Sequence, residues 1–211
     1  MSRYGDGDYE PIIGKDGKEK NVSGLWQHSL QIALTSKRGQ QALRDLRDAP
    51  MALPRHELIE GALCTVGLTE RIEAMPEKVV RDVTPFNYET KEYGAPVPTE
   101  VHNYDRDSLI QYVGEHDDQP EGVCAVGAYV WWQKVKAGMD PAAAFADLPV
   151  LPDTDTGEWQ TAEVGVEAGL SERLAYYLAW LNDESFGYMA ADERWQLYVK
   201  WIGEHLEAVP A

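Results

Sequence analysis

The stretch GVCAVGAYVWWQKVKAG, residues 122–138, decides the fold of this chain. It opens with the longest apolar run of the sequence, and it ends with Lys134, Lys136 and Gly138. Basic residues in a last helical turn complement the negative end of the helix dipole, and a glycine just beyond that turn stops the helix. The stretch therefore predicts a helix, or a strand that leads into a helix, over residues 123–137.

Small residues inside this stretch predict a close contact with another backbone segment. Gly127 has no side chain to hold a neighbour away, and Ala125 and Ala128 keep the same region narrow. Cys124 is expected to fill core, and Cys64 lies in a similar apolar run, GALCTV. Apolar flanks raise the pKa of a thiol and make it unreactive, so both cysteines are predicted to be buried thiols.

Patterns of helical period flank this stretch on both sides. Apolar residues recur every three or four positions, with charged residues between them. Ala42, Leu43, Leu46 and Ala49 form one such face, while Arg44, Asp45, Arg47 and Asp48 are assigned to solvent. Pro50 is expected to end or kink that helix, because proline removes a donor and clashes with the preceding turn. Helices are thus predicted over 24–35, 36–49, 141–146, 161–168, 171–181 and 190–206.

Residues 84–104 differ from the rest of the chain. They contain Pro85, Pro96 and Pro98, show no period, and are expected to form a loop because proline interrupts a strand ladder. Loops of this length inside a domain are uncommon and often bind a partner. We therefore expect an interaction surface made of the aromatic residues of the loop and the acidic residues after it: Phe86, Tyr88, Tyr93, Tyr104, Asp105, Asp107, Asp117 and Asp118.

The predicted fold class is mainly α, a single compact helical domain that admits a short β-hairpin and a loop-rich insertion. Residues 1–23 are expected to be flexible, and residues 24–211 to form the domain, with 65–121 inserted in it. On either side of the loop, Thr69 is the predicted N-cap of a helix broken near Pro76, and Asp105 is the predicted N-cap of a helix over 106–113.

The charge of the chain restricts its partners. The formal net charge is −17, and residues 1–64 are balanced with nine acids and nine bases. Residues 65–122 hold 13 acids against 5 bases, and residues 123–211 hold 14 against 5. Such a surface repels nucleic acid and anionic lipid and attracts basic partners. Residues 123–132 are too few to span a bilayer and the start of the chain has no apolar core, so a cytoplasmic protein is expected.

No motif in the chain predicts a catalytic, cofactor-binding or metal-binding residue. The acidic run at His116 reads as a solvated turn, and no phosphate-binding loop or nucleophile elbow occurs. Residues 162–181 have helix-turn-helix spacing, but Arg173 is the only base after the turn, which disfavours DNA reading. If the protein is an enzyme, the first candidates are Asp105, Asp107, Asn182, Asp183 and Glu184.

Several short motifs, taken in order, resemble a known family. They are KRGQ at 37–40 with LRDL at 43–46, LP at 53–54, LI at 58–59, GVCAVGA at 122–128, NDE at 182–184, and ERW at 193–195 with Trp201. In this order they resemble a family of uncharacterised proteins of tailed bacteriophages and prophages, over residues 25–64 and 122–207. Members of that family usually join the LI and CALGA segments by a short turn, so the resemblance implies that 65–121 is an insertion. Pro50 replaces a usual apolar residue, and the resemblance implies no catalytic residues.

Three functions remain open at this point. The first is a phage-encoded acidic accessory protein that binds and modulates a host protein in the host cytoplasm, in its sharpest form as a DNA mimic that captures a basic groove. The second is a small enzyme acting on a nucleotide or metabolite. The third is a minor virion or assembly component.

Overall fold

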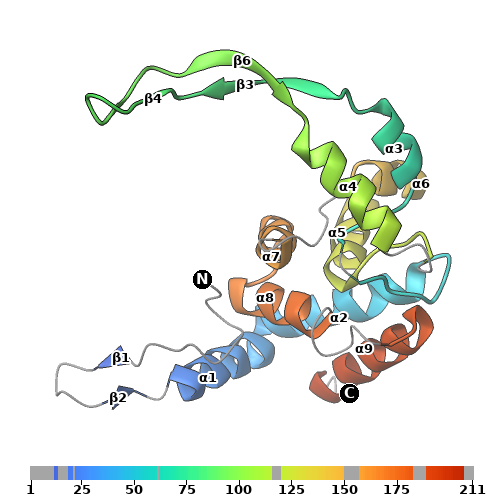
Figure 1. Ribbon diagram of the computed structural model, residues 1–211. Coiled ribbons are helices and arrows are strands. Elements are labelled where there is room, and N and C mark those ends of the chain that lie inside the picture. The colour runs from blue at the N-terminus through green and yellow to red at the C-terminus, as the bar shows by residue number, and fades with distance from the viewer. Residues whose placement is uncertain are drawn as a thin grey trace. The chain divides into compact units, whose positions relative to one another are not determined.

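The fold is mainly α-helical, as predicted, and it includes β-hairpins, as seen in a computed structural model (Figure 1). The structure describes residues 12–13, 19–20, 22–60, 62–115, 120–149, 157–182 and 189–206. The chain divides into two compact units. Unit 1 combines Met1–Val66 with Gln119–Ala211, and unit 2 is Gly67–Asp118, close to the predicted insertion. Most of the segment predicted to be flexible, 1–23, lies outside the described residues.

Unit 1 is built from helices at nearly all the predicted places. Its two shortest elements, β1 and β2, pair as antiparallel strands before the first helix. The elements are β1 (Ile12–Ile13), β2 (Glu19–Lys20), α1 (Val22–Thr35), α2 (Lys37–Ala52), α5 (Ala125–Lys136), α6 (Pro141–Ala146), α7 (Gly157–Glu167), α8 (Glu172–Trp180) and α9 (Ala191–His205).

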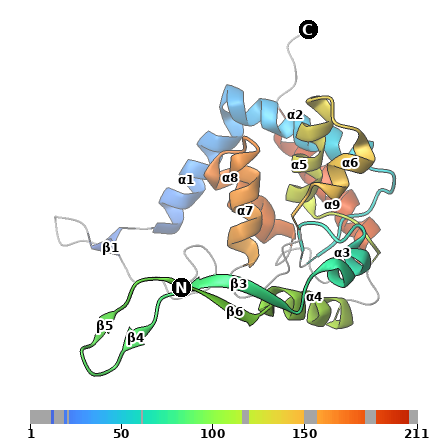
Figure 2. The ribbon, with the colours of Figure 1, turned by 90° about the horizontal axis from the view of Figure 1, so that it is seen from above.

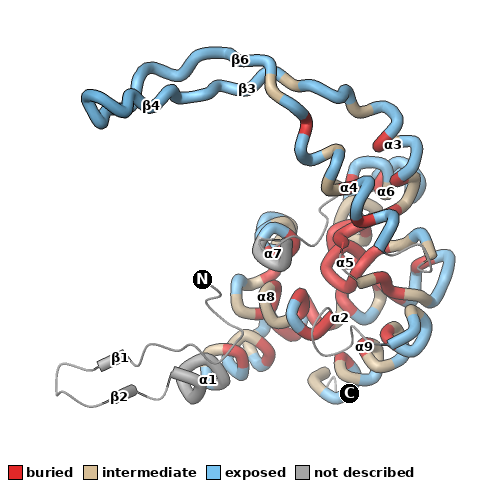
Figure 3. Tube along the Cα trace, in the orientation of Figure 1, coloured by how far each residue is buried: buried red, intermediate tan, exposed pale blue. Residues whose placement is uncertain are grey.

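Helix α5 is the centre of unit 1. It packs against α2, α6, α7 and α8, and its residues from Ala125 to Trp131 are buried (Figure 3). Cys124 is its N-cap, with the Sγ atom accepting a hydrogen bond from Gly127 N at 3.3 Å. Gly138, with φ of 96°, lies two residues beyond the end of the helix, so the predicted stop is confirmed.

The close approach predicted at Gly127 is confirmed. A Cβ atom at this position would lie 2.2 Å from the carbonyl oxygen of Leu63, closer than any real contact. That oxygen accepts a hydrogen bond from Cys124 N at 3.1 Å, and Cys64 pairs with Val123 in a single antiparallel bridge. Cys64 and Cys124 are both buried and neither forms a disulfide, as expected.

Helix α2 differs from the prediction in its end and in Asp45. It begins after Ser36, whose Oγ accepts a hydrogen bond from Gly39 N, and it continues through Pro50 to Ala52, so of the two effects expected of Pro50, an end or a kink, the end is wrong. Pro50 is buried and its carbonyl accepts a hydrogen bond from Trp195 Nε1 at 3.0 Å, which holds this turn against α9. Asp45, assigned to solvent, is buried: Gln133 Nε2 and the Lys136 Nζ of α5 donate to it at 3.0 and 2.9 Å.

A buried arginine of α9 holds the segment that follows α2. Arg194 is 2% exposed and donates to the Leu58 carbonyl at 2.7 Å, to Glu60 Oε2 at 2.7 Å and to the Met189 carbonyl at 3.0 Å. Its neighbour Trp195 stacks on His56 with ring centroids 4.5 Å apart. The ERW motif therefore connects α9 to the irregular segment 56–60.

Unit 2 contains a long β-hairpin where a loop was predicted. Its elements are α3 (Leu68–Ala74), β3 (Lys78–Val83), β4 (Phe86–Asn87), β5 (Glu92–Tyr93), β6 (Val97–His102) and α4 (Tyr104–Glu115). Strand β3 pairs with β6 from Lys78↔His102 to Val83↔Val97, and β4 pairs with β5. Pro98 lies opposite Asp82 in this ladder. Each strand of a two-stranded ribbon has one unpaired edge, where a residue without an N–H is tolerated.

The two helices of unit 2 begin at other residues than predicted. Helix α3 follows Gly67, whose φ is 65°, so Thr69 lies inside the helix instead of capping it. Helix α4 begins at Tyr104, and Asp105 therefore lies in its first turn. The buried Asn103 precedes this helix, and its side chain donates to the Pro76 carbonyl at 2.9 Å.

The two points where unit 2 interrupts unit 1 are tied together. Thr65 N donates to the Gly122 carbonyl at 2.9 Å, and Gly122 N donates to Thr65 Oγ1 at 3.0 Å. With the Cys64–Val123 bridge next to them, these bonds form a clasp between residues 64–65 and 122–123. The clasp belongs entirely to unit 1.

Candidate functional site

The first candidate region is the hairpin arm, which we define as residues 78–102. Every residue from Val80 to Glu100 is exposed (Figure 3). The arm leads out from α3 and α4 as a narrow ribbon, and β4 and β5 lie at its far end (Figures 1 and 2). A two-stranded ribbon with no buried face is at best marginally stable by itself, so this exposure calls for an explanation.

Three aromatic residues gather at the end of the arm and form what we call the aromatic tip: Phe86, Tyr88 and Tyr93. The Phe86 ring meets the Tyr88 ring edge-on at 5.1 Å and lies 4.9 Å from the Tyr93 ring, its cross-strand partner. Tyr88 and Tyr93 are 85% and 74% exposed. The turn is ordered by Asn87 Oδ1, which accepts hydrogen bonds from Glu89 N and Thr90 N. The tip is therefore a preformed aromatic cluster.

The other predicted surface residues lie at the opposite end of the arm or outside the described residues. Tyr104 is exposed beside His102, with ring centroids 5.3 Å apart. Asp105 accepts a hydrogen bond from Arg81 at 2.6 Å, and Asp107 lies 2.6 Å from His102. Asp117 and Asp118 fall outside the described residues. The structure thus clusters three of the predicted residues and gives Asp105 and Asp107 basic partners on the arm.

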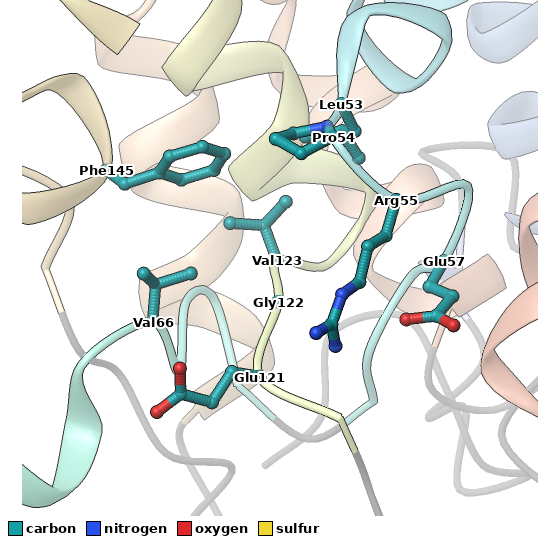
Figure 4. Close-up of a pocket in the computed structure, with 9 residues that line it drawn as sticks. All are labelled: Leu53, Pro54, Arg55, Glu57, Val66, Glu121, Gly122, Val123 and Phe145. Carbon is teal, nitrogen blue, oxygen red and sulfur yellow. The ribbon is translucent and has the colours of Figure 1, made fainter. Parts of the chain in front are cut away.

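The second candidate region is a pocket of about 400 Å³ in unit 1 (Figure 4). Its residues come from four separate stretches of the chain. They are Leu53, Pro54, Arg55, Glu57, Val66, Glu121, Gly122, Val123 and Phe145. Their spacing along the chain carries no motif, so only the packing of α2, α5 and α6 with the connecting segments brings them together.

One part of this pocket is apolar and the other is charged. Phe145, Pro54 and Val123 lie toward one side in Figure 4, and the Phe145 ring is stacked on Trp131 at 4.8 Å. On the charged side, Arg55 extends into the space between Glu57 and Glu121 (Figure 4). Among the described residues, none forms an ion pair with any of these three side chains.

Glu57, one of the residues that line this pocket, has an unsatisfied oxygen. Its Oε2 atom is shielded from solvent and accepts no hydrogen bond from any described residue. A shielded acceptor without a donor costs about 1–3 kcal/mol, and more when it is charged. A donor that drew the Glu57 carboxylate toward the pocket would remove that cost.

The residues named as enzyme candidates have structural contacts of their own. Asn182 is buried, with Oδ1 accepting from Ala125 N at 3.3 Å and Nδ2 donating to the Ile59 carbonyl at 3.0 Å. Asp183 and Glu184 lie outside the described residues. Asn182 does not line the pocket, and neither do Asp105 and Asp107, which contact Arg81 and His102. Within the described ranges, no group of three His, Cys, Asp or Glu side chains is placed to hold a metal ion.

The predicted helix pair is confirmed as α7 and α8, which pack side by side (Figure 2). Gly169 makes the turn between them with φ of 109°. Its carbonyl accepts a hydrogen bond from Arg38 of the KRGQ motif at 2.9 Å, and Gln40 of the same motif donates to the Leu34 and His205 carbonyls. These motif residues therefore connect helices of unit 1.

Comparisons with known protein families, with curated protein sequences and with solved structures found no match to this chain. Among the helices in the described part of the chain, none is both long and apolar enough to cross a membrane.

Proposed function

We propose that this chain is an accessory interaction protein that binds a partner protein through the aromatic tip of its hairpin arm. The observation that carries the proposal is the preformed, exposed cluster of Phe86, Tyr88 and Tyr93. Rigid aromatic side chains supply much of the binding energy of protein interfaces, because each buries roughly 150–250 Å² at small entropic cost. An arm with no buried face gains stability when a partner covers it.

The resemblance to phage proteins supports a host protein as the partner, and the net charge of −17 favours one with a basic surface. In this proposal the charge steers the encounter, and the aromatic tip supplies the affinity. Capture by carboxylates alone, as in DNA mimicry, is less favoured. Lys78, Arg81 and His102 lie within ion-pair distance of Glu100, Asp105 and Asp107, so these acids have basic neighbours along the arm.

Photo-crosslinking in the host cell tests this proposal. A benzophenone amino acid is placed at position 88 in the tip, and a matched control is placed at position 32, because Ile32 is an exposed apolar residue of α1 in unit 1. We expect one discrete crosslinked partner from position 88 and none from position 32. Adding Phe86→Ser and Tyr93→Ser should abolish the crosslink, because these changes remove the aromatic rings that fix the tip.

Salt separates the two binding modes when the crosslinking is repeated in host lysate. Binding through the tip should survive an increase from low to high salt with little loss, whereas a carboxylate surface that replaces DNA should lose its partner steeply. Identical crosslinks from positions 88 and 32, or no crosslink at position 88, would contradict the proposal.

A further inference from the structure

The pocket of unit 1 carries an inference that is independent of the arm. We propose that it binds a small zwitterion with an apolar side group, a ligand of the α-amino acid class. The proposal rests on three features of the pocket: its size, its apolar side and the arrangement of its three charges.

The size and the apolar side fit such a ligand. A volume of about 400 Å³ lies within the range of small-molecule sites, which are mostly apolar with a few polar groups. Leu53, Pro54, Val66, Val123 and Phe145 form the apolar lining. Phe145 is stacked on Trp131, so its position is fixed before a ligand arrives. This side would hold the aliphatic or aromatic side group.

The charged side fits the two ends of an α-amino acid. The Arg55 guanidinium is the fork that recognises a carboxylate with two parallel hydrogen bonds. Glu57 and Glu121 flank Arg55 in the pocket, as Figure 4 shows, and their carboxylates recognise an ammonium group. Arg55 extends between the two acids in Figure 4, so this side of the pocket offers a counterpart for each charge of an α-amino acid.

A ligand with only one charge suits the pocket less well. A simple amine would place its cation beside Arg55, and a simple carboxylate would meet both Glu57 and Glu121. A zwitterion pairs each of these groups with its opposite. A Glu57 side chain that turned toward the pocket would also gain the ammonium as a donor to Oε2, which is shielded and lacks a donor in the structure.

The test is an NMR titration of the full chain with three related probes. L-phenylalanine carries both charges, phenethylamine lacks the carboxylate, and 3-phenylpropionate lacks the ammonium. We expect L-phenylalanine to shift the amide signals of Leu53, of residues 55–57 and of residues 121–123 with a sub-millimolar Kd. Each one-charge probe should bind at least about tenfold more weakly, because it leaves one of the pocket charges unpaired.

Variants assign the binding to the charged side. Glu57→Gln and Arg55→Gln should each weaken L-phenylalanine at least about tenfold, because each removes one charge partner. Glu193→Gln, the same change at an exposed acid of α9, is the matched control and should leave the affinity unchanged. Because Arg55 is exposed, its variant keeps the fold even if Glu57→Gln disturbs it.

Three results would overturn the proposal. The first is the absence of shifts with L-phenylalanine at millimolar concentration. The second is that phenethylamine or 3-phenylpropionate binds as tightly as the amino acid, since the pocket would then recognise only one of the two charged groups. The third is binding that neither Glu57→Gln nor Arg55→Gln alters.

Discussion

Replacing Gly127 with alanine tests the packing at the centre of unit 1. The new Cβ atom would lie 2.2 Å from the Leu63 carbonyl oxygen and 3.1 Å from Val123 Cβ, whereas ordinary contact begins near 3.4 Å. The carbonyl or the helix must therefore move by more than an ångström. Such a movement breaks the 3.1 Å hydrogen bond from Cys124 N to Leu63 O, next to the clasp.

The magnitude follows from three contributions. Overpacking a dense core costs about 1–3 kcal/mol. Loss of the buried hydrogen bond costs about 1–3 kcal/mol, because both of its atoms lose their partner. Alanine returns up to about 1 kcal/mol, because it favours a helix over glycine. The free energy of unfolding of unit 1 should therefore fall by about 3 kcal/mol.

Urea unfolding followed by tryptophan fluorescence measures this effect. All seven tryptophans lie outside residues 67–118, so their fluorescence follows unit 1 and not unit 2. Gly203→Ala is the matched control, since Gly203 lies inside α9 and a Cβ there would meet nothing within 4 Å. That variant should be about 0.5–1 kcal/mol more stable than the parent. A Gly127→Ala protein as stable as the parent would refute the reasoning.

Three further predictions address buried and charged groups. Arg194→Met should lower the free energy of unfolding by about 3–5 kcal/mol in urea titrations, because it leaves Glu60 without this partner. As a control, Lys200→Met at an exposed position should change the free energy of unfolding by less than about 0.5 kcal/mol. Tyr198→Phe should stabilise the protein by up to about 1–3 kcal/mol, because the Tyr198 hydroxyl is buried and accepts or donates no hydrogen bond among the described residues. Burial, with a smaller effect of Cys124, raises the pKa of Tyr198 well above its ordinary value. The free energy of unfolding should therefore be unaffected by the ionisation of this group at lower pH and should fall as the pH rises above about 10, where the unfolded chain loses the phenol proton. In alkaline unfolding titrations the Tyr198→Phe protein should lose less of its free energy of unfolding. The hydrogen bond and charge of Lys134 lower the pKa of the Asp147 carboxyl, so the stabilisation by this pair is complete above the ordinary carboxyl pKa and is lost as the pH falls through the lowered pKa. In Lys134→Met, NMR titration should find the pKa of Asp147 restored, and an unchanged value would contradict the pairing.

The helices of unit 1 could be predicted because their signals are local. The apolar faces of α2 and α9, the glycine after α5 and the cap of α6 each occupy a few adjacent residues. Asp140 Oδ1 accepts hydrogen bonds from Ala142 N and Ala143 N, just ahead of the first-turn proline, as the sequence indicated. Helix α2 runs two residues past Pro50, where the Pro50 carbonyl accepts a hydrogen bond from α9, a partner far away in the sequence.

The hairpin arm could not be predicted from its pattern. A strand with one buried face alternates apolar and polar residues, but the arm has no buried face and so shows no alternation. Its prolines argued against a ladder, and that argument holds for central strands and not for a two-stranded ribbon. The aromatic residues were nevertheless predicted to form an interaction surface, because they lie in a proline-rich segment that shows no helix or strand period.

The pocket and the buried Asp45 were missed for a different reason. Glu121 is separated from Arg55 and Glu57 by a whole inserted unit, and Asp45 meets Gln133 and Lys136 across more than eighty residues. A helix period places Asp45 beside charged neighbours but cannot say that α5 supplies its donors. Only tertiary packing makes these groups neighbours.

The clasp between Thr65 and Gly122 has a consequence for how this chain can vary. The clasp holds the two ends of the insertion next to each other by bonds within unit 1. The entropic cost of bringing these two ends together depends only weakly on the length of the inserted segment. Doubling the inserted length costs roughly 0.6 kcal/mol, less than one ordinary hydrogen bond. Segments of very different length and charge can therefore be exchanged at this point, while the helices that surround α5 keep their packing.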